Sequence, residues 1–200
     1  MRSTPFTDSV ARYRAGKFGM RIFLVSLGML FAASLLGYLI IRMKPAPWPQ
    51  DLPRLPGALW ISTAVLVASS FTMQWALRAA RANHQALLRT MMLITTYAGI
   101  AFLVIQFRAW LTWLEPVTLR WEDSSGNEYR YALAGFYVLT GLHAAHVIGG
   151  LVPLVVVTRN AFRGEYSADY HPGVQYVAMY WHFLDAVWIV LFATLKLSLG

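Results

Sequence analysis

Four ionisable residues lie inside long apolar segments, and they are the residues of this chain best placed to do chemistry. His143 and His146 share one apolar segment, and His182 and Asp185 share another. Each pair is three residues apart, a spacing that puts both side chains on one face of a helix. Because an ionisable group is costly to bury in hydrocarbon, such residues are functional candidates wherever they reach membrane depth.

Three kinds of site fit these residue types. The side chains could join two helices by hydrogen bonds, they could hold haem b between His143 or His146 and His182, or they could form a metal site of two or three histidines with Asp185. Intramembrane polar residues often pair with one another, so the spacing alone favours the interhelical polar site.

The depth of the two pairs supports a meeting between them. At a rise of about 1.5 Å per residue, His146 and Asp185 reach similar depths if their helices run antiparallel across the membrane. Gly149 and Gly150 follow the histidine pair and permit a close approach of the two helices. Antiparallel helices therefore bring His146 and Asp185 to a depth at which hydrogen bonds could tie the two helices together.

The composition requires that a membrane surrounds these residues. Apolar residues make up 58% of the 200-residue chain and charged residues 13%, against about 25% charged in a soluble domain. The net charge is +8, but the basic residues lie between apolar runs and form no nucleic-acid-binding face, so no nucleic acid partner is expected. The chain has no Cys, which excludes disulfides, iron–sulfur clusters, c-type haem attachment and thiolate-bridged copper.

Five segments are long and apolar enough to cross a bilayer as helices. We predict an all-α bundle in which a cytoplasmic tail, 1–19, precedes a five-span membrane domain, 20–200. The spans are expected at about 20–41, 57–77, 91–114, 131–157 and 174–197. Lys and Arg are more frequent on the side of the N-terminal tail, which predicts that the N-terminus is inside and the C-terminus outside, with an acidic loop, 115–128, outside.

Two further polar residues are candidates for a structural or lipid-contacting role. Gln106 is the polar member of a packing face in the third span. Arg159 lies at the predicted inner end of the fourth span, where it could hold a phospholipid head group. On the same side, His84 and His171 could relay protons at the membrane surface, although histidines in loops are commonly just solvated. The sequence as a whole shows no nucleophile–base pair and no phosphate-binding glycine loop.

Two motifs resemble one known family. TGLHAAHVIGG at 140–150 resembles the fourth span of the five-helix subunit III proteins of haem–copper terminal oxidases. HPG at 171–173, followed by YWHFLDAVW at 180–188, resembles the last span of the same family, which includes cytochrome c oxidase subunit III. Weaker similarity extends from about Lys17 through Ser69-Ser70 to Gln106. The resemblance is to the short form of the family, without two extra N-terminal helices.

The resemblance implies a non-catalytic subunit of an oxidase that reduces O2 and pumps protons across the inner (cell) membrane. Such a subunit holds no haem or copper, which belong to the partner subunits I and II. It packs on the catalytic subunit, binds phospholipid and supports proton uptake and stable turnover. His143, His146, His182 and Asp185 match the family motifs, which favours a structural role for them.

The chain departs from the family at positions where carboxylates are common. Leu27, Ala109 and Gln175 stand where the family often has Glu, and Arg21 stands where it often has Trp. These departures are compatible with a divergent branch, for example a subunit of a related nitric oxide reductase. A free-standing b-type cytochrome with haem on His143 or His146 and His182 remains the alternative from a different class, and a small transporter is a third.

Overall fold

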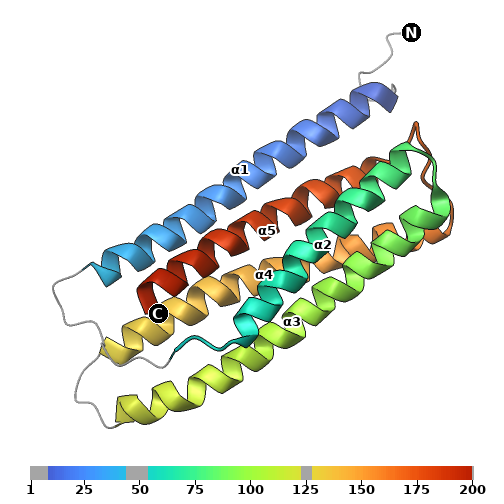
Figure 1. The fold of residues 1–200 in the computed structure, drawn as a ribbon. Helices are drawn as coiled ribbons and strands as arrows, with labels where there is room; N and C mark the ends of the chain where they lie inside the picture. Colours follow the sequence, from blue (N-terminus) through green and yellow to red (C-terminus); the bar gives the residue numbers. More distant parts are fainter. Residues whose placement is uncertain (1–8, 44–53, 123–127, 200) are drawn as a thin grey trace.

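Five long helices form the fold, as Figure 1 shows for this computed structural model. The structure describes residues 9–43, 54–122 and 128–199, and within these ranges it has no β-strand. The helices are α1 (Ser9–Arg42), α2 (Ala58–Arg81), α3 (Gln85–Glu122), α4 (Glu128–Phe162) and α5 (Pro172–Leu199). The predicted all-α class is confirmed. The direction of the chain across the membrane stays a prediction.

Most helices extend well beyond the apolar segments that predicted them. α1 begins eleven residues before the predicted span, and α3 has 38 residues where the prediction had 24. The predicted acidic loop, 115–128, is largely helical, because α3 continues through Pro116 to Glu122. A proline removes only one backbone donor, so it need not end a helix. Residues 123–127 lie outside the described part of the chain.

Four of the five helices are long and apolar enough to cross a membrane, namely α1, α3, α4 and α5. α2 forms as predicted, but its 24 residues do not reach the same mean hydropathy. The reason is a series of hydroxyl and amide side chains, several of which contact neighbouring helices. The hydroxyl and amide residues of α2 are Ser62, Thr63, Ser69, Ser70, Thr72 and Gln74.

α2 and α3 form a tight hairpin, and α4 and α5 complete the bundle. The turn from α2 to α3 consists of residues 82–84, and Asn83 adopts a left-handed backbone conformation with a φ of 57°. α5 contacts α1, α2 and α4, so it lies between α1 and the rest of the molecule (Figure 1). α1 packs on α5 and, less extensively, on α4.

Close packing in the bundle depends on large aromatic side chains set against glycines. A Cβ at Gly150 of α4 would lie 2.5 Å from the Tyr180 ring of α5. A Cβ at Gly99 of α3 would lie 2.6 Å from the Trp181 ring. Gly150 thus permits the close approach that the sequence predicted. Gly149 does not take part, because no atom lies within 4 Å of its Cβ position and it faces outward.

Candidate functional site

His143 lies in the centre of the bundle and is completely buried. Its ring packs 5.0 Å from the Trp188 ring of α5 and 5.8 Å from the Phe102 ring of α3. Phe31 of α1 contributes a third aromatic ring at 6.3 Å. Neither ring nitrogen of His143 has a hydrogen-bond partner among the described residues. His143 is therefore surrounded by aromatic side chains from three helices.

His146 is half-buried and bonds within its own helix. Its Nδ1–H donates to the carbonyl of Leu142 at 2.7 Å, and its ring packs edge-on against Phe31 at 5.1 Å. The carbonyl of His146 accepts a hydrogen bond from the Tyr180 hydroxyl of α5 at 3.0 Å. α4 and α5 are thus joined at this level by Tyr180 and a backbone carbonyl, whereas the imidazole faces α1.

The expected hydrogen bond between His146 and Asp185 does not form. Both carboxylate oxygens of Asp185 are buried and have no hydrogen-bond partner among the described residues. Asp185 lies between Trp181 and Trp188 on α5, and both indoles bond to α2. The helices run antiparallel as predicted, but the two side chains lie on different faces: His146 contacts α1 and Asp185 lies on the α2 side of α5.

His182 makes the polar contact between helices that the motif suggested, but with a different partner. Its Nδ1 shares a hydrogen bond of 2.6 Å with the Ser70 hydroxyl of α2. The other ring nitrogen, Nε2, is buried and has no hydrogen-bond partner in the part of the chain that the structure describes. His182 therefore joins α5 to α2 and not to the histidine pair of α4.

Two tryptophans extend this contact into a series of hydrogen bonds along α2 and α5. The Nε1–H of Trp181 donates to the Ser69 hydroxyl at 2.9 Å, and the Nε1–H of Trp188 donates to the Thr63 hydroxyl at 2.9 Å. Together with the Ser70–His182 bond they form what we call the α2–α5 polar seam. The seam was not predicted from the sequence, although a weak signal was present: the two tryptophans are seven residues apart, and their partners Ser69 and Thr63 are six apart.

The remaining candidates are dispersed. Gln106 of α3 is buried, and neither its amide oxygen nor its amide nitrogen has a partner among the described residues. Arg159 is exposed near the end of α4. His84 is exposed in the turn before α3, and the Nδ1–H of His171 donates to the Ser167 carbonyl at 3.1 Å. Neither Gln106 nor Arg159 makes a hydrogen bond to the histidine pairs.

The three positions at which the resemblance implied carboxylates are all buried. Leu27 is 6% exposed, Ala109 is 0% exposed and Gln175 is 8% exposed. The Oε1 of Gln175 accepts a hydrogen bond from the Tyr13 hydroxyl of α1. A neutral side chain at each position avoids the desolvation of a buried carboxylate.

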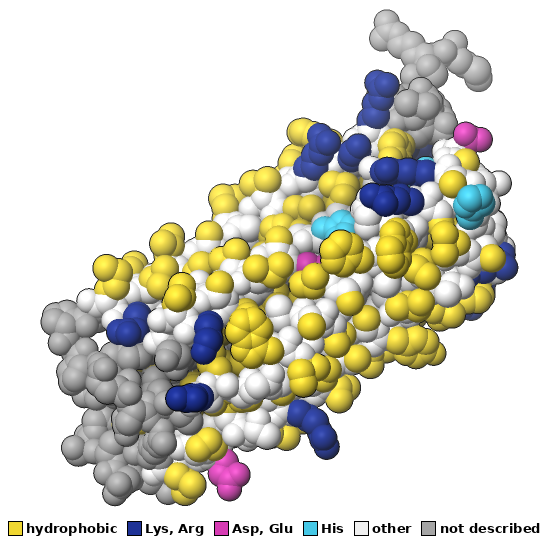
Figure 2. Space-filling model, viewed as in Figure 1, with side chains coloured by type: hydrophobic (Ala, Val, Ile, Leu, Met, Phe, Trp, Pro, Cys, Tyr) yellow, Lys and Arg dark blue, Asp and Glu magenta, His cyan; other side chains and the backbone are white. Residues whose placement is uncertain are grey.

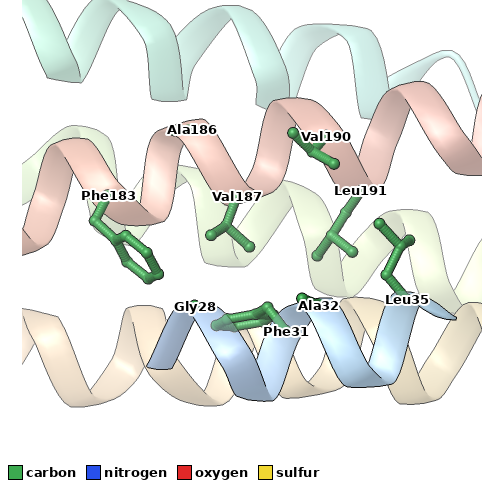
Figure 3. A pocket seen from close by; sticks show the side chains of 9 residues that line it. All are labelled: Gly28, Phe31, Ala32, Leu35, Phe183, Ala186, Val187, Val190 and Leu191. Carbon is green, nitrogen blue, oxygen red and sulfur yellow. The ribbon is translucent and has the colours of Figure 1, made fainter. Parts of the chain in front are cut away.

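The packing argues against a haem between the histidines. His143 is enclosed by aromatic rings, His182 is bonded to Ser70, and none of three hollows along α1 and α5 is lined by a histidine. The apolar groove nearest to them, between α1 and α5, has a volume of about 270 Å³ (Figure 3). Its lining residues are apolar and include no iron ligand: Gly28, Phe31, Ala32, Leu35, Phe183, Ala186, Val187, Val190 and Leu191. Within the described residues, no group of three or more His, Asp or Glu side chains could hold a metal ion.

The surface divides the molecule into an apolar middle and two charged ends. On the face that Figure 2 shows, hydrophobic side chains extend along most of the length of the bundle, and Lys and Arg side chains gather mainly toward its two ends. Such a distribution is typical of a protein whose middle faces lipid hydrocarbon and whose ends meet the head groups.

Comparison with known proteins decides the family. The family model described as cytochrome c oxidase subunit III matches residues 6–197, a range that includes nearly all of the five helices. The chain belongs to the cytochrome c oxidase subunit III family. One relative is cytochrome c oxidase subunit 3 of Synechocystis sp., which is 36% identical to this chain over 181 residues. The matched residues cover 88% of this chain and 72% of that protein.

Other subunit III relatives match to a similar extent. Cytochrome c oxidase subunit 3 of Thermostichus vulcanus is 32% identical over 179 residues, which cover 88% of this chain and 84% of the relative. A probable cytochrome c oxidase subunit 3 of Nocardia farcinica is 35% identical over 179 residues, which cover 88% and 85%. The four apolar helices and the family membership together make this chain a multi-pass membrane protein.

Proposed function

We propose that this chain is the non-catalytic subunit III of a haem–copper respiratory oxidase and works in aerobic electron transport. The observation that carries the proposal is the family match over residues 6–197. The relatives cited above are named as subunit 3 of cytochrome c oxidase, so oxidase subunits I and II are the partners we expect. The haem and copper of the complex then belong to those partners.

The side chains of this chain suit a structural role. Its membrane-depth histidines are enclosed by aromatic rings or bonded to neighbouring helices, so they stabilise the bundle. The sequence has no Cys, and cysteine thiolates are the bridging ligands that a dinuclear copper site requires. The work of subunit III is then to pack on the catalytic subunit and to keep it stable during turnover.

Phospholipid binding is the second part of the proposal. Arg159 is exposed at the end of α4, where a guanidinium can meet a lipid phosphate at the membrane surface. We expect Arg159→Ala to lower the amount of phospholipid that copurifies with the subunit, measured by lipid mass spectrometry. An unchanged lipid content would remove Arg159 from the proposal.

Support of proton uptake is the third part. His84 and His171 lie at the predicted inner end of the bundle, and histidine is the side chain that titrates near neutral pH. Replacing both by Gln should slow proton uptake by the assembled oxidase while leaving its assembly intact. Uptake at the rate of the unaltered oxidase would assign these residues to the solvated surface only.

One experiment tests the proposal as a whole. The full chain, tagged and extracted in a mild detergent, should recover a larger subunit together with haem and copper, identified by its visible spectrum and by metal analysis. Recovery of the chain alone, folded and colourless, would contradict the role in an oxidase. Recovery of the chain alone with a haem spectrum would favour a b-type cytochrome instead.

A further inference from the structure

Two buried polar side chains in the centre of the bundle have no hydrogen-bond partner among the described residues. Gln106 of α3 is 1% exposed, and both its amide oxygen and its amide nitrogen lack a partner. His143 of α4 is 0% exposed, and both of its ring nitrogens lack one. Buried polar groups in folded proteins are nearly always hydrogen-bonded, so these four atoms require a partner.

Gln106 and His143 lie at the same level along the bundle. The Nε1–H of Trp110 on α3 donates to the Thr140 hydroxyl of α4 at 3.1 Å, which fixes the register of the two helices. Gln106 lies four residues before Trp110, and His143 lies three residues after Thr140. Because α3 and α4 run antiparallel (Figure 1) and rise about 1.5 Å per residue, the two side chains differ in level by about 1.5 Å.

The face of α3 that carries Gln106 is directed at His143. Phe102 lies four residues before Gln106, on the same face of the helix, and its ring packs 5.8 Å from the His143 ring. The Thr140 hydroxyl is already used, because it donates to the Phe136 carbonyl at 2.6 Å and accepts the bond from the neighbouring indole. The partner of Gln106 is therefore expected on the His143 side.

α2 contributes a third polar side chain at this level. The hydroxyls of Thr72 and Thr95 meet at 2.8 Å, which fixes the register of α2 and α3. Ser62 lies ten residues before Thr72, and ten residues after Thr95 α3 reaches the turn that carries Gln106. Ser62 is 0% exposed, and its hydroxyl donates to a carbonyl of its own helix at 2.9 Å. The hydroxyl oxygen is then left able to accept a hydrogen bond.

We infer that Ser62, Gln106 and His143, which we call the central polar layer, bind an ordered water molecule. An internal water makes about three hydrogen bonds to buried polar groups that otherwise lack partners. This water accepts from the Gln106 amide nitrogen and donates to the acceptor nitrogen of a neutral His143 and to the Ser62 oxygen. One molecule thus joins α2, α3 and α4 in the middle of the bundle. The site does not depend on the proposed role in an oxidase.

The surroundings of the central polar layer suit water better than a larger ligand. The Trp188 ring packs 5.0 Å from the His143 ring, and both residues are completely buried, so the layer is closed to solvent. Ser62 and Ala109 are small and completely buried, which favours room beside Gln106 for one water. Within the described residues, no group of three or more His, Asp or Glu side chains could hold a metal ion here instead.

Solution NMR of the purified full chain in detergent micelles tests for this water directly. We expect the side-chain amide protons of Gln106 to show a cross-peak with water whose sign indicates dipolar contact and not hydrogen exchange. The signal is assigned by its loss in Gln106→Leu. The Nε1–H of Trp181 is the control, because this residue is 1% exposed and its indole is bonded to Ser69. Absence of the cross-peak at Gln106, or an equal one at Trp181, would overturn the bound water.

The same spectra distinguish a water bridge from a direct bond between the two side chains. With a bridging water, both the Gln106 amide protons and the His143 ring protons are expected to contact the same water signal. A strong cross-peak between the Gln106 amide and the His143 ring, with no contact to water from either, would show that the side chains bond directly. That result would refute the water site.

Unfolding equilibria test whether the two side chains share one partner. Gln106→Leu and His143→Phe each leave the other group of the layer unsatisfied, and each should lower the folding equilibrium constant about tenfold. The double variant removes both groups, so it should be no less stable than either single variant. Gln106→Leu combined with His146→Phe is the matched control, because His146 bonds within its own helix and these losses should add. Additive losses for Gln106→Leu with His143→Phe would contradict a shared water.

Discussion

Replacing Ser70 by Ala removes one hydrogen bond of the α2–α5 polar seam and leaves the rest of the bundle unchanged. The Ser70 hydroxyl lies 2.6 Å from the Nδ1 of His182, and it also lies near the Asp185 carboxylate. His182 would then have two unpartnered ring nitrogens, because its Nε2 already has no partner among the described residues. We expect the variant to fold but to be less stable.

The size of the effect follows from the environment of the bond. Hydrogen bonds between membrane helices contribute about 0.6 kcal/mol on average and at most about 1.7 kcal/mol. Leaving a buried partner unsatisfied costs about 1–3 kcal/mol. Ser70 and His182 are both half-buried, which limits the second cost. We therefore expect Ser70→Ala to lower the free energy of unfolding by about 1–2 kcal/mol.

A double-mutant cycle separates the bond from other effects of the substitution. Ser70→Ala, His182→Phe and the double variant are compared by reversible unfolding of the purified chain in mixed detergent micelles. A coupling energy of about 0.6–1.7 kcal/mol is expected. Thr90→Ala serves as the control, since its hydroxyl bonds only to its own helix and is exposed. A coupling energy of zero, or an equal loss in the control, would refute the role of the bond.

Three other substitutions test separate features of the bundle. Gly150→Val should destabilise the chain by about 1–3 kcal/mol through collision with the Tyr180 ring, while Gly141→Val, which has open space, should not; thermal unfolding compares them. Asp185→Asn should change stability by less than about 1 kcal/mol, because neither carboxylate oxygen has a geometric hydrogen bond within the described residues and an amide oxygen can still face the nearby Ser70 hydroxyl; a large loss in unfolding measurements would disprove this. Trp188→Phe should lose about 1–3 kcal/mol, since the indole hydrogen bond is removed and the smaller ring leaves a void at a completely buried position; an unchanged unfolding transition in the same assay would disprove this.

Hydrophobic length predicted the helices but not their ends. Each of the five apolar segments became a helix, because a backbone in hydrocarbon must satisfy its hydrogen bonds internally. The first and third helices continue past those apolar segments. Polar residues such as Arg12 and Glu115 are exposed there, which is typical of helix ends that lie outside the hydrocarbon. Hydropathy does not predict such extensions, because it indicates which part of a helix lies in lipid and not where the helix ends.

The candidate site was predicted by residue but not by partner. The spacing of His143 and His146 placed both on α4, yet spacing within a helix leaves open which neighbour each side chain faces. That choice depends on helix rotation, which is set by large contacts such as Trp181 against Gly99. The expected partner of Asp185 was therefore wrong, whereas its burial was predicted correctly.

The modest hydropathy of α2 has a consequence for how the chain enters the membrane. A helix rich in hydroxyl side chains gains little free energy when it inserts into the membrane by itself. The reason is that transfer of each polar side chain into hydrocarbon is unfavourable. α3 follows after a turn of three residues, and its hydroxyls meet those of α2, as in the 2.8 Å contact between Thr72 and Thr95. We expect the two to insert as one helical hairpin, so that a chain ending after Arg81 would fail to retain α2 in the bilayer.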